Sequence, residues 1–89
     1  MSDGISAGRA IQLRYPETPD WAAVEEHVLI ELIEDFEWEQ SCATSAILEL
    51  ALRDCGRFEG LAKWLLGHPA ADSWLKAAAA DALELHASS

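Results

Sequence analysis

The chain has 89 residues, of which 51% are hydrophobic, so it is long enough for one domain whose core can form without a disulfide or a metal. Its formal net charge of −10 repels nucleic acids and anionic membranes, which disfavours direct binding to either. The N-terminal sequence has no basic stretch followed by an apolar one, and no apolar run reaches the length of a membrane span, so we expect a cytoplasmic protein.

The negative charge is concentrated in one part of the chain. Ten acidic residues and no lysine or arginine lie between Tyr15 and Leu52. The other segments hold the remaining six of the 16 acids and all six cations, so their charges cancel. A segment of this kind attracts basic protein surfaces.

The N-terminal residues 1–17 are predicted to be a flexible or extended arm that precedes a single helical domain over residues 18–87. Apolar and polar residues alternate in the sequence AIQLRY, which is typical of a strand, but no second alternating run is present to pair with it. We therefore expect an arm that lies extended on the helices, with a short additional helix as the alternative.

A long first helix is predicted over residues 18–40. Thr18 is suited to be its N-cap, Pro19 its first helical residue, and Asp20 lies near the positive end of the helix dipole. On a wheel of about 100° per residue, acidic residues occupy one half of this helix of about six turns. The other half is apolar and consists of Trp21, Val24, Val28, Leu29, Leu32, Ile33 and Phe36.

Three further helices complete the prediction. The sequence SCATS at 41–45 favours caps and turns, so a second, apolar helix is expected over 44–55 at the centre of the fold. One continuous helix through SCATS is the alternative. A short third helix is expected over 57–66, and an alanine-rich fourth helix over 69–86. The predicted fold class is all-α: a compact bundle of about four helices with an extended N-terminal arm.

The two cysteines, Cys42 and Cys55, are expected to be buried, reduced thiols. If one helix carries both, they point in different directions and lie too far apart to form a disulfide. Arg53 and Arg57 flank Cys55 and suggest the less favoured alternative of a reactive thiol with a lowered pKa.

The candidate partner-binding site is the polar half of the first helix. Ile30 and Trp38 lie there among the acids, and tryptophan is enriched at the energetic centres of interfaces. These carboxylates repel one another, and a basic partner would relieve the repulsion on binding. The alternative explanation for the carboxylates is that they only keep the protein soluble. The complete set of candidate residues is Glu26, Ile30, Glu31, Glu34, Asp35, Glu37 and Trp38.

Two other functions remain open, although the sequence has no recognisable catalytic or phosphate-binding motif. A structural or regulatory subunit would assemble or dimerise through Trp38, Trp64 and Trp74. A small metal-binding helical enzyme, the less favoured of the two, would use His27 and Glu31, which are one helical turn apart.

In size, charge and helical content, the chain resembles the nucleic-acid mimics found among anti-restriction and anti-CRISPR proteins. In size and charge it also resembles bacteriocin immunity proteins. Carboxylates on successive helical turns lie about 5–6 Å apart, a spacing comparable to that of phosphates along a strand. The resemblance implies an inhibitor of a nucleic-acid-binding protein. We expect a non-catalytic interaction module without a cofactor, a monomer or homodimer, that binds a basic protein surface and neither nucleic acid nor membrane.

Overall fold

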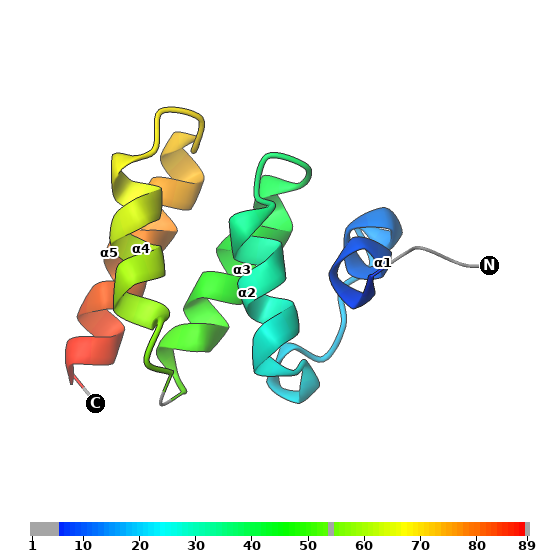
Figure 1. Ribbon diagram of the computed structural model, residues 1–89, viewed down its shortest axis with the longest axis horizontal. Helices are drawn as coiled ribbons and strands as arrows, with labels where there is room; N and C mark the ends of the chain where they lie inside the picture. Colours follow the sequence, from blue (N-terminus) through cyan, green and yellow to red (C-terminus); the bar gives the residue numbers. More distant parts are fainter. Residues whose placement is uncertain (1–5, 54, 89) are drawn as a thin grey trace.

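The computed structural model describes residues 6–53 and 55–88, which form five α-helices and one short 3₁₀ helix (Figure 1). No residue in these two ranges lies in a β-strand, so the all-α fold class is confirmed, with one helix more than expected. Within the same ranges, no helix is both long and apolar enough to cross a membrane. The elements are α1 (Ala7–Arg14), η1 (Trp21–Ala23), α2 (Glu26–Glu34), α3 (Gln40–Ala51), α4 (Phe58–Gly67) and α5 (Ser73–Ser88).

Helices α2 to α5 form two stacked helical hairpins. In Figure 1, α2 and α4 lie on the near side and run in the same direction, while α3 and α5 return behind them. The hairpins pack together mainly through α3 and α5, and α1 lies against the outer side of α2. Glu26 and Phe58 begin α2 and α4 and are 32 residues apart, while Gln40 and Ser73 begin α3 and α5 and are 33 apart. The second hairpin therefore repeats the sequence spacing of the first.

The core lies within and between the two hairpins. Alanines on the facing sides of α3 and α5, among them Ala43, Ala46, Ala79 and Ala82, are fully buried and allow the two helices to pack closely. Larger apolar side chains fill the remaining space. The largest of those that are fully buried are Phe36, Phe58, Leu29, Leu32, Ile33, Ile47, Leu50, Leu65 and Leu75.

The prediction of one long helix over residues 18–40 is wrong. Val24 and Glu25 have extended backbones, with ψ of 134° and 150°, so η1 and α2 are separate. The Arg53 side chain donates hydrogen bonds to the carbonyls of Trp21 and Ala22 at 3.1 and 3.3 Å. These long-range bonds satisfy carbonyls that a continuous helix would have used itself, so the tertiary structure stabilises the break.

The turn between the first and second predicted helices was expected at SCATS and lies instead at residues 35–39. SCATS is part of α3, which therefore spans 40–51 where 44–55 was expected. Thr44 is accommodated there because its hydroxyl donates to the Gln40 carbonyl at 3.0 Å, and Cys42 and Ala43 are buried. Placing the turn earlier brings Cys42 and Ala43 of SCATS into the core, while Ser41 stays exposed.

The last two helices were predicted more closely. The third was expected over 57–66 and is observed as α4, Phe58–Gly67. The fourth begins at Ser73 and not at Pro69, because the Asp72 carboxylate accepts a hydrogen bond from the Leu75 amide at 2.8 Å and caps the first turn.

The predicted extended arm is replaced by α1, so the short additional helix was the correct alternative. The Ser6 hydroxyl caps it by accepting a hydrogen bond from the Arg9 amide at 3.1 Å. Ile11 packs against the core, whereas Leu13 is 57% exposed, so α1 buries little apolar surface. Residues 1–5 of the predicted arm lie outside the described residues.

Candidate functional site

The seven predicted site residues do not form one continuous exposed ridge. Ile30 is 9% exposed and belongs to the core, which corrects its assignment to the surface. Because α2 ends at Glu34, Asp35, Glu37 and Trp38 lie in the following turn and not on the helix. Their side chains therefore do not continue the helical stripe that the sequence predicted.

Three of the predicted residues contact α1. The Asp35 carboxylate is 3.0 Å from Nη2 of Arg9, and the Glu31 carboxylate accepts a hydrogen bond from the Ser6 hydroxyl. The Arg9 guanidinium also lies over the Trp38 ring, 3.8 Å from its centre. Trp38 thus packs against the N-terminal segment and remains 55% exposed. The chain therefore supplies its own cation to this part of the predicted site.

The contact between α1 and α2 is mainly polar. Gly8 lets the helices approach, because a Cβ at this position would lie 2.6 Å from the carboxyl carbon of Glu31. Gln12 is buried and donates to the Asp35 carbonyl at 3.3 Å. Arg9 Nε and Gln12 Oε1 are buried without a hydrogen-bond partner in the described part of the chain. Because an unsatisfied buried polar atom destabilises an interface, we expect α1 to be held less firmly than the hairpins.

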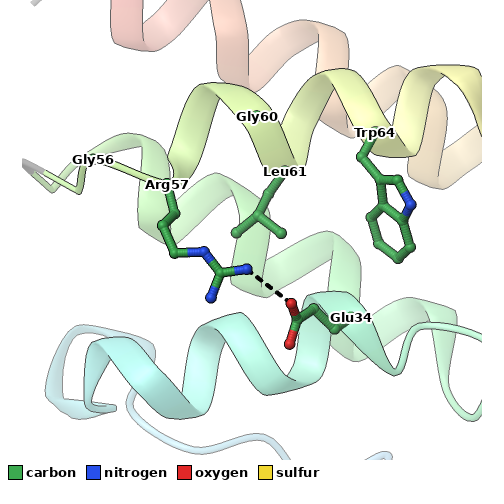
Figure 2. A pocket seen from close by; sticks show the side chains of 6 residues that line it. All are labelled: Glu34, Gly56, Arg57, Gly60, Leu61 and Trp64. Carbon is green, nitrogen blue, oxygen red and sulfur yellow. Dashed lines mark hydrogen bonds and ion pairs between the residues drawn. The ribbon is translucent and has the colours of Figure 1, made fainter.

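On its other side, α2 faces α4. The Glu34 carboxylate is 2.9 Å from Nη2 of Arg57, as Figure 2 shows. Both side chains are about half exposed (51% and 58%), so solvent screens the pair and it stabilises the fold by no more than about 1 kcal/mol. The ion pair crosses a groove of about 600 Å³. The groove is lined by Glu34, Gly56, Arg57, Gly60, Leu61 and Trp64.

The groove is open because two of its lining residues have no side chain. A Cβ at Gly56 or at Gly60 would meet no atom within 4 Å. Trp64 lies at the far end of the groove in Figure 2 and is 41% exposed. Its ring packs edge-on against Phe36 and His68, with ring centres 5.5 and 5.1 Å apart. These contacts orient the exposed indole.

Both cysteines are free and buried, as predicted. Burial is the main cause that raises the pKa of Cys55 above its ordinary value, and the neighbouring Glu26 carboxylate raises it further. Burial, with a smaller contribution from Glu39, also raises the pKa of Cys42. The alternative of a reactive Cys55 thiol with a lowered pKa is therefore wrong. Arg57, which was expected to lower it, pairs with Glu34 instead.

The structure also locates the residues named for the two alternative functions, a structural subunit and a metal-binding enzyme. Trp38, Trp64 and Trp74 are exposed by 55%, 41% and 80%, and no ring contact within the described ranges joins two of them. His27 Nε2 is 3.8 Å from a Glu25 carboxylate oxygen, whereas Glu31 turns toward α1. Residues 6–53 and 55–88 contain no group of three or more His, Cys, Asp or Glu side chains placed to hold a metal ion.

Ion pairs neutralise only part of the acidic surface. Four of the six cations form ion pairs with acids in the described chain, namely Arg9, Arg53, Arg57 and Lys63. Several exposed carboxylates have no lysine or arginine partner within the described residues. These include Glu17, Asp20, Glu25, Glu26 and Glu37, all from the acidic segment.

Sequence reasoning missed the α4 side of the site. Gly60 and Trp64 are four residues apart on α4, the spacing that places them on one helical face, and Gly56 lies in the turn before this helix. A glycine inside a helix disfavours it, so Gly60 was a signal that the missing side chain matters there, and the structure has open space at this position. The position of Arg57 opposite Glu34 depends on long-range packing and had no local signal.

Comparison of the chain with protein-family models, with curated proteins and with solved structures found no match. The site is therefore interpreted from its own geometry and charge.

Proposed function

We propose that this protein is a non-catalytic interaction module that binds a basic segment of a partner protein on the acidic surface around α2. The observation that carries this proposal is the surplus of exposed carboxylates, Asp20, Glu25, Glu26 and Glu37, that no lysine or arginine of the described chain neutralises. A surface with uncompensated charge accelerates association with an oppositely charged partner and selects against a negatively charged one.

The contact of Arg9 with Asp35 and Trp38 supports the proposal from within the molecule. One guanidinium there pairs with a carboxylate at 3.0 Å and stacks on an indole ring at 3.8 Å. Both interactions favour arginine, whose planar group binds carboxylates and aromatic faces. An arginine of a partner can use the same chemistry elsewhere on this surface.

A nucleic-acid-mimicking inhibitor is a narrower form of this proposal and has less support. Mimicry requires a regular row of free carboxylates, whereas Asp35 and Glu34 pair with arginines of the chain and Glu31 contacts Ser6. The broader proposal does not depend on this regular spacing.

The test is binding of labelled peptides of equal length that carry arginine, lysine, citrulline or glutamate, followed by fluorescence anisotropy. The basic peptides should bind, and their affinity should fall steeply between about 0.05 and 0.5 M salt as the charges are screened. The double substitution Glu26→Gln and Glu37→Gln should weaken binding several-fold. Its matched control, Asp81→Asn with Glu84→Gln on α5, removes the same charge elsewhere and should have a smaller effect. Equal binding of the arginine and citrulline peptides would contradict the proposal.

A structural subunit is the second candidate, because the Trp74 side chain is 80% exposed. Burial of this ring at an interface would stabilise an assembly with little dependence on salt. Sedimentation of wild type and Trp74→Ala at low and high salt separates the two functions, since only self-association through Trp74 should be lost in the variant.

A further inference from the structure

We propose that the groove between α2 and α4 is a recognition site for an arginine side chain in an extended segment of the partner. This inference rests on the proposed function. It names the chemical class of the ligand, an arginine-bearing peptide, and the place on the protein where that arginine binds. Three features of the groove carry it: an acidic wall, an open floor without side chains, and an exposed indole at one end (Figure 2).

The acidic wall is provided by α2. Glu26, Ile30 and Glu34 are four residues apart and share one helical face. Glu34 lines the groove, Ile30 is buried beneath this face, and Glu26 lies near Cys55 at the beginning of the opposite wall. Of these two carboxylates only Glu34 lines the groove, where Arg57 pairs with it, and the Glu26 carboxylate adds a second negative charge beside Cys55. Two carboxylates and one guanidinium in this region favour a cation over an anion.

Arg57 marks the position that the guanidinium of the partner would take. Its Nη2 is 2.9 Å from the Glu34 carboxylate, yet both side chains remain about half exposed. A solvent-exposed pair exchanges partners at little cost, so an incoming arginine can replace Arg57 at Glu34. The chain already combines an arginine with a carboxylate and an indole at Arg9, Asp35 and Trp38. In the groove, Glu34 and Trp64 supply the same two kinds of group.

The dimensions of the groove fit a short, extended peptide segment. The groove volume of about 600 Å³ lies within the range of about 300–1,000 Å³ that is usual for ligand sites. From Arg57 to Trp64, α4 rises by about 10 Å, which corresponds to about three residues of extended chain. Gly56 and Gly60 leave space for the peptide backbone, and Leu61 offers an apolar contact to a neighbouring side chain.

The experiment is ¹⁵N–¹H correlation NMR of the labelled protein with an acetylated, amidated peptide that contains Arg-Leu-Arg between glycines and serines. Its control is the same peptide with citrulline, a neutral isostere, at each arginine. The arginine peptide should shift the amide signals of Gly56 and Gly60 and the indole signal of Trp64. The indole signal of Trp74 is the internal reference and should stay in place.

Two pairs of variants make the test specific. Gly60→Leu fills the groove and should weaken binding by about tenfold or more, whereas Gly67→Leu, at a second α4 glycine with open space around it, should not. Glu34→Gln and Arg57→Gln break the same ion pair and so affect folding alike. They should act oppositely on binding: Glu34→Gln weakens it by about tenfold, and Arg57→Gln strengthens it by up to about fivefold because the internal competitor is gone.

Unchanged affinity of Gly60→Leu, or shifts that cluster on other residues, would overturn the groove assignment and leave the proposed function standing. If neither the wild type nor any variant prefers the arginine peptide to its citrulline control, both proposals fail. A glutamate-bearing peptide that shifts the Gly60 signal through Arg57 would also overturn the assignment, because the groove would then bind anions.

Discussion

Arg9 lies over Trp38, with its guanidinium carbon 3.8 Å from the centre of the indole ring. The same side chain pairs with Asp35 at 3.0 Å, and Gln12 donates to the Asp35 carbonyl at 3.3 Å, so two residues of α1 join it to the turn that follows α2. Apart from Ile11, α1 adds little to the core, so its attachment depends on polar contacts, of which Arg9 makes two.

Substitution of Arg9 by glutamine should loosen α1 without unfolding the hairpins. Loss of the ion pair and of the cation–π contact should cost about 1 kcal/mol locally, or about fivefold in hydrogen-exchange protection of the α1 amides. Exchange monitored by mass spectrometry checks this, and Arg14→Gln, at an exposed arginine at the end of α1, is the control. Equal protection in Arg9→Gln and wild type would show that other contacts hold α1.

Truncation of Phe58 to alanine should destabilise the protein by about 3–5 kcal/mol, because this fully buried ring would leave a cavity at the beginning of α4. Trp74→Ala removes a larger ring that is 80% exposed and should change the free energy of unfolding by no more than about 0.5 kcal/mol. Urea denaturation of both variants checks the prediction. A large loss in Trp74→Ala would mean that this ring is buried in solution, as in an assembly.

The buried thiols should make the protein less stable at alkaline pH. Burial raises the pKa of Cys42 and Cys55 above the ordinary value of 9.0, so the folded chain retains protons that the unfolded chain has lost. This contribution to stability is fully present below pH 9.0 and is lost as the pH rises through the raised values. Urea denaturation from about pH 8 to pH 10.5 should show a smaller decline in the double variant Cys42→Ala, Cys55→Ala than in wild type. Parallel declines would contradict the raised pKa values.

Gly60→Ala should stabilise α4 by about 0.5–1 kcal/mol, because alanine favours the helix and its Cβ meets no atom within 4 Å. Thermal unfolding measures the gain. Gly8→Ala is the contrasting variant, since its Cβ would lie 2.6 Å from the Glu31 carboxyl carbon and force that side chain away from Ser6. A glycine that lowers the stability of α4 and leaves open space at position 60 is consistent with a role for that space.

The candidate site was only partly predictable from sequence. The assignment of Glu34 and Asp35 to a partner-binding site stays a prediction, and their internal partners Arg57 and Arg9 lie 23 and 26 residues away in the chain. Such pairing depends on how the helices pack, and no short stretch of the sequence indicates that packing. Ile30 was misplaced because the wheel does not show which elements pack over the face assigned to solvent, and α1 packs against α2 in the structure.

The sequence by itself determined the fold class and most of the core. Apolar residues at helical spacing identified Leu29, Leu32, Ile33 and Phe36 as buried, since that periodicity follows from helix geometry whatever the neighbours are. Only the tertiary structure decided where the helices end and which carboxylates stay free. The bonds from Arg53 to the carbonyls of Trp21 and Ala22, and the pairing of Arg9 and Arg57 with acids of the α2 region, exist only after the hairpins have packed. Such long-range bonds outweigh local helix propensity, which amounts to less than about 1 kcal/mol per residue.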